Sequence, residues 1–331
     1  MKCTKRGIRI LIIAFLLIAS CVLHLFSGQF DLTLTDYYSA LVDFDVNNQF
    51  QLIAREIRIP RLLAALLSGA ALSISGLIMQ TLFRNPLAGP YVLGINSGAS
   101  LMVALLTLTG STFFISQLGI VSASLIGGIA TGMIILLLST RITSSVSLLL
   151  IGLMIASFSS AVISVLQSLG SDSGLKQFTM WTLGSLQHVS FDQLGGLTLL
   201  ILLGIGGSLL AAKPLNVLLL GEDAAQLLGV NVKLIRVVLI GISILLASVI
   251  TAYCGPIAFV GLAIPNVTRM VFNTQNHLTL IIGSALFGSL FLVLVDSLSQ
   301  IAEPVFILPI NAITSFIGAP FVILILLKRI K

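Results

Sequence analysis

Residues 85–140 decide the fold, and they read NPLAGPYVLGINSGASLMVALLTLTGSTFFISQLGIVSASLIGGIATGMIILLLST. The stretch contains no Asp, Glu, Lys or Arg. A helix needs about 20 apolar residues to cross the hydrocarbon core of a membrane, so this stretch predicts two crossings. Thr, Gly and Ser near 109–112 separate them. A membrane-spanning backbone must satisfy its own hydrogen bonds, and nothing alternates as a barrel strand does, so both crossings are predicted to be helices.

The rest of the chain repeats this pattern. Further charge-free runs cover 10–30, 62–83, 142–171, 193–212, 237–268, 270–295 and 304–327. The chain of 331 residues is 57% hydrophobic and 8% charged, against about 25% charged in a soluble domain, and its mean hydropathy is +1.14. So few charged groups cannot cover a soluble surface. The composition therefore excludes a soluble enzyme, a disordered chain and a nucleic-acid-binding domain.

These runs predict an all-α membrane protein with one transmembrane domain over residues 1–331. The approximate helix spans are 8–26, 59–82, 92–110, 118–139, 144–169, 193–212, 234–253, 257–272, 278–297 and 305–327. The region 234–272 leaves nine or ten crossings open, because it can hold one tilted helix or two short ones. Gly255-Pro256 breaks it, and two crossings place Arg236 and Arg269 on one side, which favours ten.

An even number of crossings puts both termini on the same side of the membrane. Basic residues gather at both ends of the chain: Lys2, Lys5, Arg6 and Arg9 at the start, Lys328, Arg329 and Lys331 at the finish. Cytoplasmic segments carry such an excess of Lys and Arg. Both termini are therefore predicted to be cytoplasmic, and much of the net charge of +6 reports orientation.

A cluster of arginines breaks this charge rule. The stretch Arg55-Glu56-Ile57-Arg58-Ile59-Pro60-Arg61 lies at the predicted outer end of the second helix. One interpretation is local anchoring, by contact with headgroups or with Glu56. The other is a docking point for an acidic partner outside, because a guanidinium binds a carboxylate with two parallel hydrogen bonds.

Proline, glycine and asparagine interrupt several of the predicted spans. Irregular backbone at membrane depth is tolerated only where it is buried in protein or lines an aqueous path. The interruptions together predict a translocation path with moving parts. The residues assigned to it are Pro86, Gly255, Pro256, Pro265, Asn266 and Pro309.

The longest predicted cytoplasmic loop is 213–233. Residues 222–228 are expected to form a short helix, because acids in its first turn suit the helix dipole and Gly229 suits the position after the helix. Ala225 and Leu228 are expected to share one face of it. This helix is predicted either to pack on the chain's own helices or to act as a lever on a cytoplasmic partner.

The sequence offers no catalytic or metal-binding arrangement. Cys3, Cys21 and Cys254 are predicted in three different environments, so neither a disulfide nor a metal site is expected. No carboxylate is predicted near the middle of a span, since Asp296 falls at the end of its helix, which disfavours a proton-coupled carrier. No G-x-x-x-x-G-K-[ST] motif occurs, so any ATP must bind to another subunit.

Eight motifs occur in an order and at a spacing that resemble one family, the FecCD or cobalamin-permease-like family. The motifs are Arg58-Ile59-Pro60-Arg61, Gly69-Ala70-Ala71-Leu72, Arg84-Asn85-Pro86-Leu87-Ala88, Leu93-Gly94 with Ser97-Gly98-Ala99, Trp181-Thr182-Leu183-Gly184-Ser185-Leu186, Gly221-Glu222 with Leu228-Gly229-Val230, Gly255-Pro256-Ile257-Ala258-Phe259-Val260-Gly261-Leu262, and Leu308-Pro309 with Ile317-Gly318-Ala319-Pro320. These family members are permease subunits of ATP-binding-cassette (ABC) importers for iron–siderophore complexes, haem and cobalamin.

The resemblance implies the type II ABC importer architecture, a homodimer of ten-helix permease subunits around a central path, and a heterodimer is the alternative. It implies two ATPase subunits, which bind ATP and Mg²⁺, while this chain binds no cofactor. It also implies a periplasmic or lipid-anchored substrate-binding protein, and a location in the bacterial inner membrane. The residue roles that it implies are docking of the binding protein by Arg58 and Arg61, a cytoplasmic gate at Asn85, Leu87, Ser144 and Ser145, and ATPase coupling through Gly221, Glu222, Ala225, Leu228 and Gly229.

The chain departs from the family pattern at three positions. Asn266 and Ile307 stand where His and Glu are common, and Gln300 stands where some members have an outer arginine. The resemblance therefore implies a bulky metal chelate without naming it. A ferric siderophore is the expected substrate, and haem and cobalamin are alternatives. The rival classes are an ion-coupled secondary transporter and a membrane scaffold.

Overall fold

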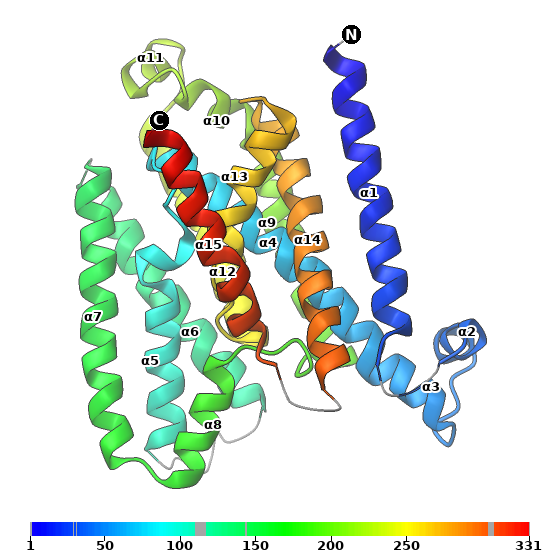
Figure 1. Cartoon of the computed structure of the whole chain (residues 1–331). Helices are drawn as coiled ribbons and strands as arrows, with labels where there is room; N and C mark the ends of the chain where they lie inside the picture. Colours follow the sequence, from blue (N-terminus) through cyan, green and yellow to red (C-terminus); the bar gives the residue numbers. More distant parts are fainter. Residues whose placement is uncertain are drawn as a thin grey trace.

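A computed structural model describes residues 2–28, 30, 32–109, 117–142, 144–303 and 308–330. Within these ranges only the backbone is described at 2–5, 117–118, 145, 325–326 and 328–330. The described part is helical and contains no strand (Figure 1). Its elements are α1 (Lys2–Phe26), α2 (Leu34–Val42), α3 (Gln49–Ile53), the π-helical turn η1 (Ala54–Arg58), α4 (Ile59–Leu82), the 3-10 turn η2 (Pro90–Leu93), α5 (Ile95–Leu108), α6 (Gln117–Ser139), α7 (Ser145–Leu169), α8 (Asp172–Thr182), α9 (Phe191–Leu210), α10 (Ala212–Leu218), α11 (Glu222–Leu227), α12 (Val232–Cys254), α13 (Val260–Phe272), α14 (His277–Ala302) and α15 (Ile310–Ile330).

A helix stands at each of the ten predicted spans, which confirms the predicted fold class. Seven described helical stretches are long and apolar enough to cross a membrane: Arg6–Phe26, Gln49–Leu82, Gly119–Ser139, Val146–Leu169, Phe191–Leu210, Val232–Cys254 and His277–Ala302. Three further apolar helices are shorter: Ile95–Leu108, Val260–Phe272 and Ile310–Leu324. The region 234–272 holds two helices, α12 and α13, on either side of Gly255.

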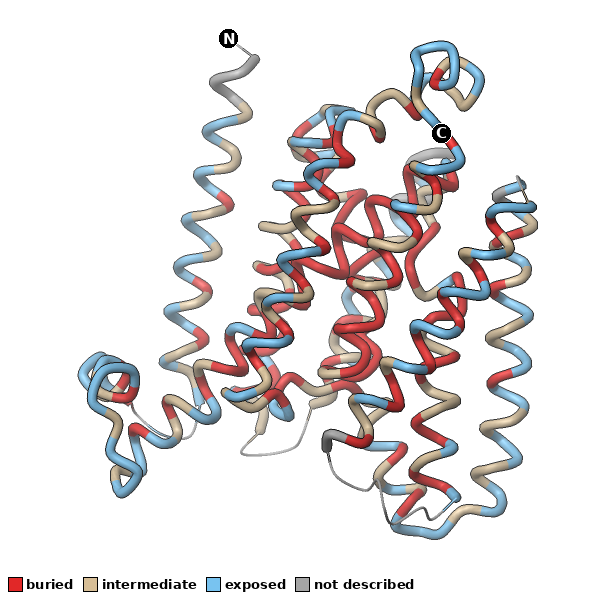
Figure 2. The backbone as a smooth tube through the Cα atoms, turned by 180° about the vertical axis from the view of Figure 1, so that it is seen from behind, coloured by how far each residue is buried: buried red, intermediate tan, exposed pale blue. Residues whose placement is uncertain are grey.

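Helix α4 forms the centre of the bundle. It packs on α12, α13 and α14, and Figure 2 shows the buried residues gathered in this inner part. Small residues allow these close approaches, since a Cβ atom on Gly69 would lie 2.1 Å from Gly288 O and one on Gly76 would lie 1.7 Å from Gly261 O. Small residues at such crossings let backbones meet, which stabilises helix pairs within a membrane.

Helices α1 and α7 stand at opposite edges of the bundle, and both show many exposed residues (Figures 1 and 2). The exposed side chains are apolar, for example Phe15 on α1 and Phe158 on α7, which are 70% and 67% exposed. Apolar surface of this kind suits contact with lipid or with another membrane subunit.

The start of α1, the end of α15 and helices α10 and α11 lie at one end of the bundle, which we call the terminal side (Figure 1). Helix α8 and the starts of α4 and α9 lie at the opposite end, which we call the α8 side. Helix α14 continues to Ala302, beyond the predicted boundary at 297. Asp296, which was expected at the end of this helix, therefore lies inside α14, before its last residues.

Candidate functional site

The interruptions predicted from sequence converge inside the bundle. After α4, Arg84 adopts a left-handed backbone conformation with a φ angle of 48°, and Asn85 closes the turn by accepting a hydrogen bond from Leu87 N at 2.9 Å. The chain then turns into η2, which packs against α4, α7 and α12. The Asn85–Pro90 segment therefore leads back into the bundle.

Tyr91 connects this segment to the break between α12 and α13. Its hydroxyl oxygen accepts a hydrogen bond from Ile257 N at 3.3 Å. It also accepts one from Thr251 Oγ1 at 3.5 Å. Ile257 lies directly after Gly255-Pro256, so its N–H has no helical acceptor. Tyr91 thus satisfies the irregular backbone at the point where the two interruptions meet.

Asn266 joins the same two segments at a second point. Its Nδ2 group donates to Pro86 O at 3.0 Å and to Leu262 O at 2.8 Å. Pro265 precedes it inside α13, and a proline there removes one helical hydrogen bond and favours a kink. The predicted path residues Pro86, Pro265 and Asn266 therefore lie together.

Gly184 and Gly255 hold a third segment in place. Both adopt positive φ angles, 69° and 71° respectively. A Cβ atom on Gly255 would lie 2.6 Å from Trp181 O, and one on Gly184 would lie 2.9 Å from Pro256 O. Ser185 N donates to Cys254 O at 2.8 Å. The loop after α8 and the break after α12 are thus packed backbone against backbone.

The start of α15 completes the cluster. Asn311 Oδ1 accepts a hydrogen bond from Ala258 N at 3.1 Å, and Asn311 N donates to Leu183 O at 3.3 Å. Pro309 O accepts from Ile313 N at 3.2 Å and so begins the helix. Five interruptions, at 84–94, 183–185, 254–259, 265–266 and 309–311, are therefore linked by side-chain or backbone hydrogen bonds.

Phe259 carries backbone strain at this junction. Its φ angle is 66°, in the left-handed region, which is unfavourable for a bulky side chain. The side chain lies against α15, where a Cβ atom on Gly318 would lie 2.4 Å from Phe259 Cβ. Strained residues persist where surrounding structure holds them, often at sites that move.

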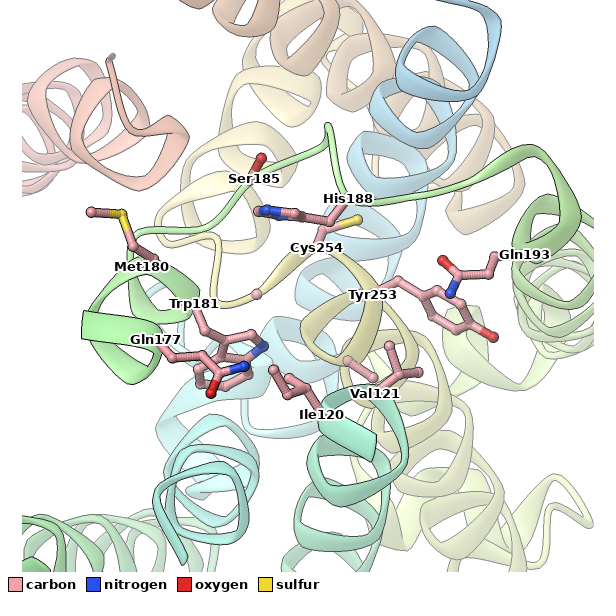
Figure 3. A pocket seen from close by; sticks show the side chains of 12 residues that line it. Ile120, Val121, Gln177, Met180, Trp181, Ser185, His188, Gln193, Tyr253 and Cys254 are labelled. Atoms are coloured by element: carbon pink, nitrogen blue, oxygen red, sulfur yellow. The ribbon is translucent and has the colours of Figure 1, made fainter. Parts of the chain in front are cut away.

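A cavity of about 220 Å³ lies beside this cluster (Figure 3). Its wall includes Ile120, Val121, Gln177, Met180, Trp181, Ser185, His188, Gln193, Tyr253 and Cys254. Figure 3 shows His188 and Cys254 close together, with Trp181 and Gln177 on one side and Gln193 on another.

The buried indole N–H of Trp181 has no acceptor among the described residues. Partial removal from water lowers the pKa of the His188 imidazole from its ordinary value of 6.5.

Arg61, predicted to dock a binding protein, is buried and has partners within the chain. Its Nε and Nη2 groups donate to the two carboxylate oxygens of Asp296 at 2.7 and 3.0 Å. Its Nη1 group donates to Glu303 Oε1 at 2.7 Å. His24 Nε2 also donates to Asp296, at 2.7 Å, and Gln300 lies within hydrogen-bond distance of His24. Sequence analysis missed this network.

Arg58 is also buried, and it contacts backbone rather than carboxylates. Its guanidinium donates to Leu25 O at 3.1 Å and to Phe30 O at 3.4 Å. Arg55 is more exposed and lies over the rings of Phe44 and Phe191, 4.3 and 4.9 Å from their centroids. The docking role of Arg58 and Arg61 stays a prediction. It requires either that their hydrogen bonds within the chain break, or that each guanidinium binds a partner while it keeps them.

The coupling segment has the predicted helix, α11. Gly221 precedes it with a φ angle of 116°, and Gly229 follows Leu228 with a φ angle of 81°. Gly229 N donates to Gln226 O and Val230 N to Ala225 O, at 2.9 and 3.0 Å. This pattern is a Schellman motif, which satisfies the last helical carbonyls.

The two faces of α11 differ from the prediction. Ala225 is buried, whereas Leu228 is 62% exposed, so the two side chains do not share a face. The reason is that Leu228 caps the helix instead of continuing it. Glu222 forms an ion pair with Arg236 of α12. Leu227 is 90% exposed and stands beside Leu228 as an apolar tip.

The predicted gate residues lie in two separate segments. Ser144 is the N-cap of α7 and accepts a hydrogen bond from Ser147 N at 3.3 Å. Ser145 begins α7, and its side chain is outside the described part, as is Ile307. No hydrogen bond between described residues joins Ser144 to Asn85 or Leu87, so the gate stays a prediction.

Known proteins resemble this chain along nearly its whole length. The model of the FecCD transport family matches residues 16–328. The haemin transport system permease protein HmuU of Yersinia pestis is 34% identical over 322 residues, which cover 96% of each chain. The vitamin B12 import system permease protein BtuC of Vibrio cholerae is 32% identical and covers 95% of this chain and 92% of its own.

A solved structure has the same arrangement of helices. It is described as an inward-facing conformation of a metal-chelate type ABC transporter, and it superposes with a TM-score of 0.86 at 29% identity. The match covers 97% of this chain and 99% of the solved one. The chain therefore belongs to the FecCD transport family and has the fold of an ABC importer permease.

Proposed function

We propose that this chain is the membrane permease subunit of an ATP-driven importer that moves a bulky metal chelate into the cytoplasm. The observation that carries the proposal is the convergence of five helix interruptions around Tyr91, Asn266 and Asn311. Irregular backbone at membrane depth that is hydrogen-bonded by side chains suits a path whose helices shift against one another.

The ends of the bundle suit two different partners. On the terminal side, α11 exposes Leu227 and Leu228, and an apolar tip of this kind suits insertion into a cleft of an ATPase subunit. On the α8 side lie Arg55, Arg58 and Arg61, which we call the arginine corner. Arg58 and Arg61 are buried and hydrogen-bonded within the chain, and we propose that they bind acidic residues of a substrate-binding protein once those contacts open. A second copy of the chain is proposed to complete the path, with the apolar face of α7 in that interface.

The substrate is proposed to be a metal chelate, with ferric siderophore as the expected member. The names of the relatives favour haem and vitamin B12 as the alternatives. The described residues contain no group of three or more His, Cys, Asp or Glu placed to hold a metal ion. We therefore propose that the chain recognises the intact chelate through its organic part and does not bind the bare metal ion.

The rival ion-coupled carrier would need a buried acid that exchanges its proton during transport. Asp296 is fully buried in α14, but Arg61 contacts both of its oxygens and His24 contacts one. A carboxylate held in this way is suited to a structural role, because three of its acceptor positions are already used.

Reconstitution separates the two classes. The permease, the ATPase and the binding protein from the same genomic neighbourhood are placed in vesicles, and uptake of radiolabelled ferric siderophore, haem and cobalamin is measured. Uptake is expected only when all three proteins and ATP are present. Robust uptake by the permease alone under an ion gradient would overturn the proposal.

A further inference from the structure

The segment between α1 and α4 contains a helix with three distinct faces, α2. At 100° per residue, Tyr37 and Ala40 lie on one side, and both are buried. Thr35, Asp36, Ser39 and Asp43 lie on a polar side. The remaining arc holds Leu34, Tyr38, Leu41 and Val42, which are 74%, 69%, 62% and 66% exposed.

The structure fixes α2 at the level where α1 ends. The Tyr37 hydroxyl donates to Leu25 O at 2.5 Å, and its ring meets that of Phe26 edge to face at 6.1 Å between centroids. Arg58 donates to the same carbonyl, Leu25 O. These contacts join α2 to the last turn of a membrane-spanning helix, so α2 lies at the boundary of the membrane and not out in solution.

Helix α2 is oriented as expected for a helix at the membrane surface. It lies at the edge of the bundle, beyond α1 (Figure 1). Figures 1 and 2 show α1 from the side, whereas α2 is seen nearly end on. The two helices therefore cross at a large angle. A helix that crosses the membrane-spanning helices in this way runs in the plane of the bilayer.

The exposed arc continues the apolar surface of α1 and carries no charge. Val22 and Phe26, near the end of α1, are 50% and 42% exposed. The acids of α2, Asp36 and Asp43, lie on the polar side, and residues 32–54 contain no Lys or Arg. Such an arc is poorly suited to an acidic protein surface or to attraction by anionic lipid, and well suited to the acyl chains of a neutral leaflet.

We propose that α2 lies in the lipid–water interface of the outer leaflet, with Leu34, Tyr38, Leu41 and Val42 inserted among the lipids. An amphipathic helix of this kind buries its apolar face to a depth of about 5–10 Å. Because α2 also holds Leu25 O together with Arg58, the inserted helix positions the arginine corner relative to the membrane.

Fluorescence quenching by lipid tests this placement. The sequence contains one Trp, Trp181, so the Trp181→Phe variant of the full chain provides a background without Trp. Tyr38→Trp places the probe in the apolar arc, and Asp43→Trp places it on the polar side as the matched control. Each variant is placed in nanodiscs of phosphatidylcholine brominated near the headgroup end of its acyl chains.

Bromolipid is expected to quench the Tyr38→Trp variant about threefold more strongly than the Asp43→Trp variant, because only the former lies in the acyl region. Adding anionic lipid is expected to leave the difference unchanged. Equal quenching of both variants, or quenching of Tyr38→Trp by aqueous acrylamide without quenching by bromolipid, would overturn the proposal, the latter by showing that water or a protein covers the arc.

A folding control keeps the result interpretable. Each variant is checked by size-exclusion chromatography and by its apparent melting temperature. If Trp181→Phe does not fold, Tyr38→Trp and Asp43→Trp are made in the unaltered chain, and the quenching of Trp181 measured in that chain is subtracted. The same two outcomes then support or overturn the placement of α2.

Discussion

Arg61 and Asp296 form a two-bonded ion pair that joins α4 to α14 across 235 positions of sequence. The Asp296 carboxylate is fully buried, and His24 of α1 donates to it as well. Helices α1, α4 and α14 thus meet at one carboxylate near the α8 side. Arg61 also reaches Glu303, beyond the end of α14.

Replacing Asp296 by Asn is expected to destabilise the folded protein. The change leaves Arg61 buried beside a neutral amide, and breaking a buried pair typically costs about 3–5 kcal/mol. The apparent melting temperature in detergent measures this loss. Glu56→Gln is the matched control, since Glu56 faces Arg55 at 3.8 Å in a partly exposed pair, and surface pairs are worth about 0–1 kcal/mol. Similar melting temperatures for both variants would contradict the structural role of Asp296.

Replacing Glu303 by Gln is expected to strengthen docking of a binding protein. The carboxylate of Glu303 holds Nη1 of Arg61 at 2.7 Å, so it competes with any acidic partner for that donor. Removing its charge should tighten association several-fold at low salt, and the gain should shrink as salt screens it. Surface plasmon resonance with the binding protein measures both effects, with Glu56→Gln as control. Weaker association of Glu303→Gln would count against docking at Arg61.

The positions of the membrane helices could be predicted from sequence because charge is excluded from hydrocarbon. The charge-free run 62–83 lies almost entirely within α4, which spans Ile59–Leu82. The interruptions could be predicted for a similar reason, since Pro and Gly mark places where helical hydrogen bonds fail. Pro86 and Asn266 were both assigned to the path, and they are in contact.

The partners of the polar residues could not be predicted in the same way. Which carboxylate faces Arg61 depends on how α4 packs against α14, and the helical pattern alone does not give that orientation. Tyr91 was missed because an aromatic residue in a charge-free run has no distinguishing signal. Helix α2 could not be predicted from the charge-free runs because it is far shorter than the roughly 20 residues of a membrane-spanning helix.

The stability contributed by His188 is expected to depend on pH. His188 remains partly exposed to solvent, and partial removal of its imidazole from water lowers its pKa in the folded protein. The unfolded chain therefore takes up the proton first as pH falls, and the effect on stability is expected to be small. This contribution is therefore complete above the ordinary pKa of 6.5 and declines as pH falls from there toward the lowered value. The difference in melting temperature between the wild type and His188→Gln should be constant above that pKa, and the wild type should lose stability relative to His188→Gln as pH falls below it. Parallel curves would contradict a lowered pKa of His188.

Replacing Gly255 by Ala is expected to disturb the central junction. The backbone at Gly255 has φ 71° and ψ −178°, a combination that is almost confined to glycine and costs other residues about 1–3 kcal/mol. The new Cβ would also lie 2.6 Å from Trp181 O. Gly206→Ala on α9 is the matched control, because nothing lies within 4 Å of its Cβ position. Thermal stability and substrate uptake should fall for Gly255→Ala and stay near wild type for Gly206→Ala; a reversed order would contradict the tight packing of this break.

Replacing Leu227 by Asp is expected to weaken association with the ATPase while leaving the permease folded. The side chain is 90% exposed, so its loss removes almost no packing within the chain. Burying a leucine side chain in an interface is worth about 1.5–3 kcal/mol, which corresponds to a loss of tenfold or more in affinity. Pull-down of the ATPase and ATP hydrolysis stimulated by the permease measure the effect. Leu227→Met keeps the apolar surface and should retain both. An unchanged melting temperature shows that the fold is intact, and normal ATPase association of Leu227→Asp would place the cytoplasmic contact elsewhere on the terminal side.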